Sequence, residues 1–491
     1  MRLSAWLMLG IATVGLSSSV WAAETVVGEK QQKNLEISIY NNNLALVKET
    51  RNVALKQGVN EVAFEGVASS IKPETALISA DGIKVLEQNY DYDLLSANNL
   101  TDKSVGQKVK TVMVNPTTGE NIFDEAEIVS ATYGIPVLKF SYGIEANFPG
   151  RLVFENLPAS LRSEPTLVAK IDSQAAENKD VSLAYLTNGI GWKTNYVAQV
   201  VDDNKLNLTG WVTINNESGI DYNNVKVQLI AGDVNQVATA VAVRPMMLAK
   251  SARMANDYAV AEGASIAPES ISGYHLYNLP LATDLKDKQT KQVSLLEKEN
   301  VSYRKEAYFS SPLYFNYNSK AQFEQMHPDM IYVLQNEKSA NLGIPLPSGI
   351  VRFYENDSEK SLQFVGEDKI SHVAEGEKMR LNLGKYFNIY ANGKVAKVSK
   401  LSETKEQDGT CSVLKTLYAY DVEVDFHNAD KKAQEIVFSQ RIDTDSKISD
   451  ENINGKLKDA SIYEWKISVP ENGEQKLTFR VTAVQKNRSC R

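Results

Sequence analysis

The chain has 491 residues, of which 43% are hydrophobic and 23% are charged, so it can bury several large cores. Acidic residues outnumber basic ones by 61 to 53, which gives a formal net charge of −8. This balance argues against a nucleic-acid partner or an anionic lipid surface, because both attract proteins through basic patches.

The first residues predict export. Arg2 precedes the apolar stretch Leu3–Val20, and Val20-Trp21-Ala22 fits the small-residue rule for cleavage of a signal peptide, residues 1–22. An uncleaved membrane anchor is the alternative, and the small residues before the cleavage point favour removal. No second apolar run of about 18 residues follows, so we expect no transmembrane segment after cleavage and a periplasmic or secreted location.

Residues 23–104 predict an N-terminal β-domain. Gly58, Gly66 and Asp81-Gly82 mark turns between short strands, and a strand about every 8 to 12 residues favours a sandwich over βαβ units. The expected strands are Leu35–Tyr40, Leu44–Val53, Asn60–Phe64, Thr75–Ser79 and Ile83–Leu86.

Residues 105–158 predict an inserted small β-barrel with the turn Asn115–Gly119 between two of its strands. Barrels of this size resemble ligand-binding modules, and a purely structural insertion is the simpler interpretation.

Residues 159–400 predict a central β-sandwich domain organised around Tyr185–Asn235. In Val225–Leu229 the apolar side chains occupy every second position, so one face is buried and the other is wet. The expected strands of this stretch are Leu183–Leu186, Asn195–Val201, Leu206–Asn215 and Val225–Ile230. Residues 236–272 are rich in Ala, Met and Ser without a sustained period, which predicts a long flexible loop; a short amphipathic docking helix is the alternative.

Residues 401–491 predict a C-terminal immunoglobulin-like β-domain, because Trp465, Ile467 and Val469 share one strand face. The only two cysteines are Cys411 and Cys490, and in an oxidising compartment we expect them to form a disulfide. Two free thiols are the alternative. The fold class is therefore mainly β: several antiparallel β-sandwich or small-barrel domains with little helix.

Four motifs follow one another in a recognisable order. They are TNGIGWKTNY at 187–196, LTGWVTINNESGIDYNNVKVQLIAGDVN at 208–235, GYHLYNL at 273–279, and IPLPSGIVRFYENDSEKSLQFVGEDKISHVAEGEKMRLNLG at 344–384. From about Leu35 to the C-terminus the chain resembles bacterial exported proteins of the domain-of-unknown-function family 4139, related to the C-terminal part of mucoidy inhibitor A-like proteins. The resemblance implies an exported, β-rich protein and supplies no catalytic residues.

Enzyme motifs are not apparent in the sequence. The four histidines are far apart, and no pair has metal-ligand spacing, so we expect no metal and no cofactor. Asp421, Glu423 and Asp425 alternate along a predicted strand; a solvated sheet face explains them more simply than a cation site. We therefore assign no catalytic residue.

Candidate binding residues lie in the motifs. Aromatic rings flanked by acids and amides can line a carbohydrate or peptide groove, and core packing with turn capping is the alternative. The candidates are Trp192, Tyr196, Trp211, Asp233, Asn235 and His372, with Tyr222 as a further ring.

These observations predict an uncharacterised envelope protein that binds or scaffolds a protein or glycan partner without catalysis. The alternative is a hydrolase of peptides or glycans whose carboxylates come from separate strands. A structural subunit that offers an edge strand to a neighbour is a third possibility.

Overall fold

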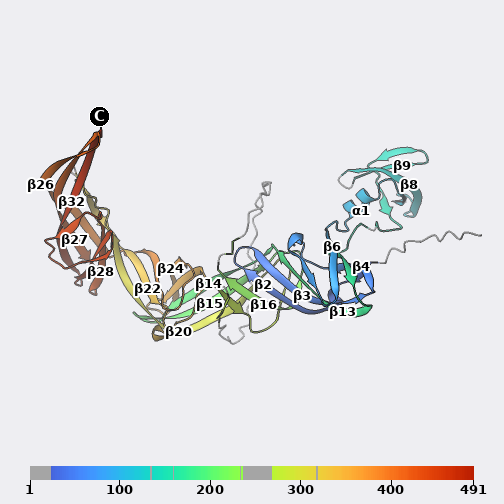
Figure 1. Ribbon diagram of the computed structural model, residues 1–491, viewed down its shortest axis with the longest axis horizontal. Coiled ribbons are helices and arrows are strands. Elements are labelled where there is room, and N and C mark those ends of the chain that lie inside the picture. The colour runs from blue at the N-terminus through green and yellow to red at the C-terminus, as the bar shows by residue number, and fades with distance from the viewer. Residues whose placement is uncertain are drawn as a thin grey trace, which may run out of the picture.

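The computed structural model describes residues 24–490, apart from 133–134, 159, 233, 236–267, 272 and 317–318. The signal segment 1–22 and most of the expected loop 236–272 therefore lie outside the described residues. Figure 1 shows an elongated molecule in which β-sheets follow one another from the N-terminal to the C-terminal part. Within these described ranges the one α-helix is α1, Ala97–Lys103, so the prediction of a mainly β chain with little helix is confirmed.

The N-terminal body is a sandwich of two sheets, with strand orders β1-β4-β12-β6 and β17-β18-β16-β2-β3-β13-β5. The strands are β1 (Thr25–Val27), β4 (Gly58–Glu65), β12 (Thr166–Ser173), β6 (Ile83–Asp91), β17 (Pro268–Ile271), β18 (Tyr274–Asn278), β16 (Tyr222–Ala231), β2 (Gln32–Tyr40), β3 (Leu44–Leu55), β13 (Glu177–Thr187) and β5 (Leu77–Ser79). Both inner faces contribute to one core, for example through Val47 and Phe64. The expected N-terminal and central domains therefore share a sheet, because β13 and β16 pair with β3 and β2.

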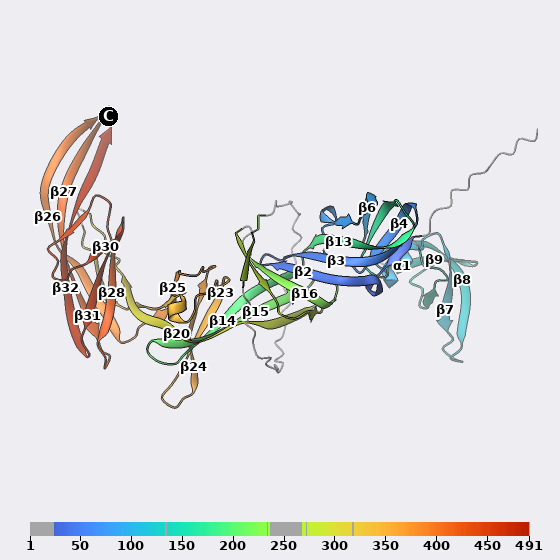
Figure 2. The same ribbon diagram turned by 60° about the horizontal axis from the view of Figure 1, so that its bottom comes forward.

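The inserted segment forms a projecting lobe (Figure 2). Its sheet has the order β10-β9-β8-β7-β11, with β10 (Gly143–Ala146), β9 (Ile135–Phe140), β8 (Asn121–Thr132), β7 (Lys108–Val114) and β11 (Arg151–Val153). The barrel prediction for residues 105–158 is wrong, since the sheet is open and β10 and β11 are its two edges. One face packs on a small core around Ile128 and Leu138. The register places Lys108, Glu127 and Lys139 in one row on the other face, so only one face of this open sheet is apolar.

A ten-stranded sheet forms the centre and reaches into the C-terminal part, with the order β24-β23-β14-β15-β20-β28-β31-β30 and with β22 and β25 branching from β20. The strands are β24 (Leu362–Ile370), β23 (Gly349–Asn356), β14 (Ile190–Val200), β15 (Lys205–Asn216), β20 (Gln289–Ser310), β28 (Gln434–Arg441), β31 (Ile462–Val469), β30 (Lys456–Asp459), β22 (Asp329–Gln335) and β25 (Lys378–Lys385). The 22-residue β20 pairs with β15 along its first part and with β22 and β28 along its last part, so it ties the centre to the C-terminal part.

The expectation of antiparallel sheets holds for most pairs, including β14 with β15. Four pairs are parallel: β1 with β4, β2 with β16, β14 with β23, and β20 with β28. Each joins segments separated by intervening strands, so the local alternation of apolar residues carries no sign of them.

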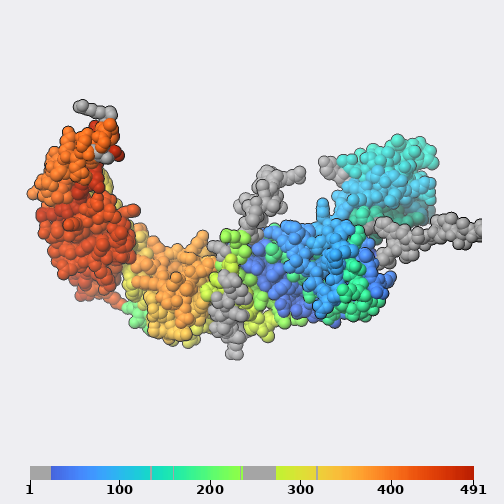
Figure 3. Space-filling model, viewed as in Figure 1, coloured from blue at the N-terminus to red at the C-terminus, as the bar shows by residue number. Residues whose placement is uncertain are grey.

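The C-terminal part is a second sandwich, in which the sheet β21-β26-β27-β32-β29 faces strands β28 and β31. Its strands are β21 (Gln322–Met326), β26 (Ile389–Asp408), β27 (Cys411–Asn428), β32 (Gly473–Cys490) and β29 (Lys447–Ser449). Trp465, Ile467 and Val469 are buried on one face, as their spacing predicts. Cys411 and Cys490 lie directly opposite each other on β27 and β32 and form the predicted disulfide. Figure 3 shows this sandwich at the opposite end of the molecule from the projecting lobe.

No helix within the described ranges is long and apolar enough to cross a membrane.

Candidate functional site

A cavity of about 500 Å³ opens into the N-terminal sandwich. Its walls come from the start of the chain, from the loop before β12, and from the loops that precede β16 and β20. The ionisable side chains of its lining comprise six carboxylates and one guanidinium, apart from the phenols: Glu29, Glu49, Glu65, Glu164, Asp221, Asp287 and Arg51. The cavity is therefore strongly acidic.

Glu49 and Arg51 form one wall of the cavity. Residues of β3 alternate between its two faces, and the inner face carries Ala45, Val47 and Val53 around this charged pair. The Glu49 carboxylate accepts two hydrogen bonds from Arg51, from Nε and from Nη2, each 3.0 Å long, and a third from the Gln32 amide. The Glu49 carboxylate is therefore already well supplied with donors.

Arg51 also connects the two sheets of the sandwich. Its Nη1 donates to the carbonyl oxygens of Val27 (2.7 Å) and Glu65 (2.5 Å), which belong to β1 and β4 of the opposite sheet. Because protein acceptors engage the guanidinium on both sides, Arg51 is not available to neutralise an incoming anion. The other charged side chains of the lining are carboxylates, which accept hydrogen bonds.

Two buried tyrosines reach this cavity from β13 and β16. The Tyr185 hydroxyl accepts a hydrogen bond from the backbone N–H of Ala68 at 3.2 Å. The Tyr222 side chain is only 1% exposed, and its buried hydroxyl meets no acceptor or donor with full hydrogen-bond geometry among the described residues. The neighbouring Ser218 hydroxyl interacts with it only enough to oppose part of the effect of burial on its pKa. Burial raises the pKa of both phenols, so both stay protonated at neutral pH. A buried hydroxyl without a partner costs about 1–3 kcal/mol, and a ligand in the cavity would remove that cost.

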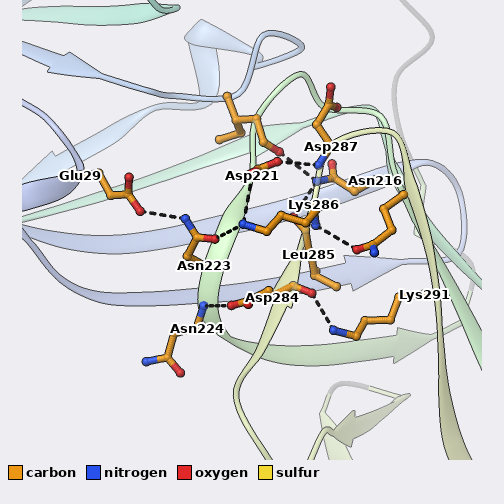
Figure 4. Close-up of polar contacts among 12 residues, drawn as sticks. Glu29, Asn216, Asp221, Asn223, Asn224, Asp284, Leu285, Lys286, Asp287 and Lys291 are labelled. Carbon is orange, nitrogen blue, oxygen red and sulfur yellow. Dashed lines mark hydrogen bonds and ion pairs between the residues drawn. The ribbon is translucent and has the colours of Figure 1, made fainter. Parts of the chain in front are cut away.

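The rim is a chain of polar contacts, drawn in Figure 4. Asn223 donates to Glu29 (2.9 Å) and accepts from the Lys286 ammonium (2.6 Å). Lys286 also pairs with Asp221, at 3.2 Å. The Asp221 carboxylate accepts the backbone N–H of Asp287 at 2.8 Å, so the loops before β16 and β20 hold each other in place.

Further contacts hold the start of β16 against the segment that precedes β20. Asp284 accepts from the backbone N–H of Asn224 (2.8 Å), and its carbonyl oxygen accepts from Lys291 (2.8 Å), as Figure 4 shows. Gly219 has a φ of +87°, and a Cβ there would lie 2.2 Å from the Ser69 hydroxyl oxygen. A glycine is therefore required where this loop passes residue 69.

The charge of the rim is stable at neutral pH. The hydrogen bond from the Asp287 backbone and, to a lesser degree, the Lys286 ammonium lower the pKa of the Asp221 carboxyl. A lowered pKa keeps this carboxylate ionised, so it can accept hydrogen bonds from a cation but is a poor proton donor. No cluster of three or more metal-binding side chains occurs in the part of the chain that the structure describes.

Of the described residues predicted from the motifs, Tyr222 lines this cavity and the others do not. Trp192 and Tyr196 point into the core from β14, where the Trp192 indole donates to the Ile39 carbonyl (2.9 Å) and the Tyr196 hydroxyl donates to the Pro347 carbonyl (2.8 Å). Trp192 also borders a separate hollow of about 280 Å³ near Asn43.

The other predicted residues are scattered. Trp211 is half-buried on the face of β15 that points away from the core, and Asn235 is exposed at the end of its motif. His372 is exposed, and its Nδ1 accepts the backbone N–H of Ser348 at 3.3 Å. Asp233 lies outside the described residues.

The sequence contains one sign of the cavity residues that the motifs did not predict. Within the predicted strand Leu44–Val53, Glu49 and Arg51 share a face with Ala45 and Val47, where alternation expects apolar residues. Two opposite charges on an apolar face indicate a buried pair. Glu29, Asp221 and Asp287 carry no comparable signal, because exposed turn acids are common.

The chain was compared with known protein families, and the match covers part of the cavity lining. Residues 181–484 match the family described as "Domain of unknown function (DUF4139)". No curated protein matches the chain. The match includes Tyr185, Asp221, Tyr222 and Asp287, whereas Glu49 and the rest of the first cavity wall precede it.

Proposed function

Because the chain belongs to the DUF4139 family, which is defined by a domain of unknown function, we propose from the cavity itself that it is an exported, non-catalytic binding protein of the cell envelope. The observation that carries this proposal is the acidic cavity with the unpartnered hydroxyl of Tyr222. A preformed concave site with a few convergent polar groups is the usual form of a binding site.

The chemistry of the lining selects the ligand. Six carboxylates surround one guanidinium that is bonded to Glu49 and to two carbonyl oxygens, so the cavity attracts cations and repels anions. A primary amine or guanidinium also donates several hydrogen bonds, which the rim carboxylates accept. The ligand is therefore a basic side chain of a protein partner.

Two features support export. The N-terminal sequence has the order of a signal peptide, with Arg2, the apolar stretch and the small-residue cleavage point. The disulfide between Cys411 and Cys490 supports an oxidising compartment, because such bonds are rare where thiols are kept reduced. Fractionation of cells that express the full chain tests the location: we expect a periplasmic or secreted protein that begins at Ala23, and a full-length cytoplasmic product would overturn the proposal.

Calorimetric titration of the mature protein with tri-lysine at low salt tests the ligand. We expect binding that weakens as salt is added, since the attraction is largely electrostatic. The double variant Asp221→Asn with Asp287→Asn keeps one acceptor oxygen on each side chain but removes two charges, and it should bind at least about tenfold more weakly. Glu359→Gln, which removes an exposed acid outside the cavity, is the matched control. Equal affinities of all three proteins, or no binding of tri-lysine, would contradict the proposal.

One observation also favours the second candidate, a hydrolase: the cavity gathers carboxylates from separate strands and loops. Against it, two of these carboxylates are unsuited to act as the general acid: Glu49 is held by Arg51, and the pKa of Asp221 is lowered. Incubation with casein and with peptidoglycan distinguishes the candidates. Turnover that Asp287→Asn abolishes would establish the hydrolase, and an absence of turnover together with tri-lysine binding would exclude it.

A further inference from the structure

We propose a second binding site, independent of the cavity: a saccharide-binding face on the outer side of the ten-stranded sheet, centred on Trp211. Five polar side chains cross five neighbouring strands there: Glu367 of β24, Arg352 of β23, Asn195 of β14, Thr213 of β15 and Gln292 of β20. We call these residues the polar row.

Strand register places the polar row on one face. Glu367 lies opposite Arg352, and Thr213 lies opposite Gln292. Asn195 lies opposite Trp211, two positions from the pair of Lys193 with Thr213. The alternate residues of β14, including Tyr196, point into the core, so the polar row and Trp211 belong to the outer face. Thr213 is itself buried, at 5% exposure, and serves to position the amides of its neighbours.

The row is a continuous chain of contacts. Arg352 pairs with Glu367 at 2.9 Å and donates to the Asn195 side-chain oxygen at 3.2 Å. The Thr213 hydroxyl oxygen receives the amide groups of Asn195 and Gln292, each at 3.3 Å. These contacts orient the amide and guanidinium groups before any ligand arrives, which reduces the cost of ordering them on binding.

Trp211 supplies the apolar part of the face. Its side chain is half-buried, and within the described residues it stacks on no other ring and its indole N–H makes no hydrogen bond. A tryptophan in this position presents ring surface and an unused donor beside prearranged polar groups.

This combination fits a neutral saccharide. Within the row the positive charge of Arg352 is balanced by Glu367 and the other three members are uncharged. The exposed Lys193, opposite Thr213 on the same face, adds a single ammonium donor beside the row. Sugar rings carry hydroxyl groups that donate and accept, together with C–H faces that pack on aromatic rings. Four interstrand spacings of about 4.8 Å make the row roughly 19 Å long, which suits an oligosaccharide lying across the strands.

Titration with neutral hexasaccharides of glucose and of N-acetylglucosamine, followed by tryptophan fluorescence and calorimetry, tests this site. We expect at least one of them to bind, and Trp211→Ala to weaken it more than tenfold. Trp211→Phe keeps a ring and should recover part of the affinity. Phe387→Ala removes an aromatic side chain that is 88% exposed elsewhere, and it should bind like the unaltered protein.

The folded state of each variant is checked by circular dichroism and thermal unfolding. Failure of every hexasaccharide to bind, or equal affinity of Trp211→Ala and the unaltered protein, would overturn the inference. Tyr222→Phe should leave saccharide binding unchanged, so this result and the tri-lysine result are separable.

Discussion

Arg51 and Glu49, two residues apart on β3, form a bidentate ion pair inside the N-terminal sandwich, where each side chain is only 2% exposed. The same guanidinium bonds to carbonyl oxygens of the opposite sheet. The pair therefore serves two purposes: it joins the sheets and it forms an acidic wall of the cavity.

Removal of Arg51 should be strongly destabilising. Arg51→Met leaves the Glu49 carboxylate buried without its partner and two carbonyl oxygens without a donor, so we expect a loss of about 3–5 kcal/mol. Urea unfolding of the mature protein measures it. Lys48→Met, on the exposed side of the same strand, is the control and should change stability by less than about 0.5 kcal/mol. A loss below about 1 kcal/mol for Arg51→Met would show that the pair does not hold the sheets together.

The two cavity tyrosines should respond in opposite ways to loss of the hydroxyl. Tyr222→Phe removes a buried hydroxyl without a partner, so stability should stay the same or rise by up to about 1–3 kcal/mol, while tri-lysine binding weakens. Tyr185→Phe removes the acceptor of the Ala68 N–H and should cost about 1 kcal/mol. Thermal unfolding of the two variants side by side checks the pair. A destabilised Tyr222→Phe would mean that its hydroxyl is satisfied within the folded protein.

Ligand binding should depend on pH with a definite sign. The pKa of Asp221 is lowered in the folded state, so its ionised contacts contribute at all pH values above its unfolded pKa of about 3.9 and are lost as pH falls through the folded value. We expect tri-lysine affinity to be level between about pH 5 and 8, and the contribution of Asp221 to be lost only below about pH 3.9, as pH falls through its lowered folded pKa. Carbon-detected titration of the Asp221 carboxyl measures the shift directly, and an affinity that rises on acidification would contradict the assignment.

The disulfide should stabilise the C-terminal sandwich. It closes a loop with a sequence separation of 79, and replacing both Cys411 and Cys490 by serine should cost about 2–4 kcal/mol. Calorimetry is expected to show unfolding of the double serine variant at a lower temperature than that of the parent. Ser412→Ala, next to Cys411 on β27, is the control. Equal transition temperatures of the double serine variant and the parent would show that strand pairing alone suffices.

Local patterns predicted the strands well where apolar residues alternate. Val225–Ile230 lies within β16, and Trp465, Ile467 and Val469 are buried together. The barrel over 105–158 was wrong, because alternation places side chains on two faces but does not say whether the edges of a sheet meet.

The binding candidates show the limit of the same reasoning. Large rings in a motif mark packing as readily as ligands, and Trp192 and Tyr196 make their polar contacts inside the core. Trp211 is a tryptophan like Trp192, but it lies on the neighbouring strand β15 and on the outer face of the sheet. The two kinds of residue differ only in the face of the sheet on which the side chain lies, and the sequence does not say which face is covered.

What the sequence alone determined is the β-rich class, the positions of many strands and the pairing of its only two cysteines, since these follow from period-two alternation and from composition. The tertiary structure decided which strands share a sheet and where charge is buried. Paired residues of β2 and β16 are 190 positions apart in the chain, and a hydrogen bond joins one such pair, Ser38 and Gln228. Long-range pairing of this kind is selected by the burial of whole faces, so the acidic cavity and the polar row exist only once the sheets have assembled.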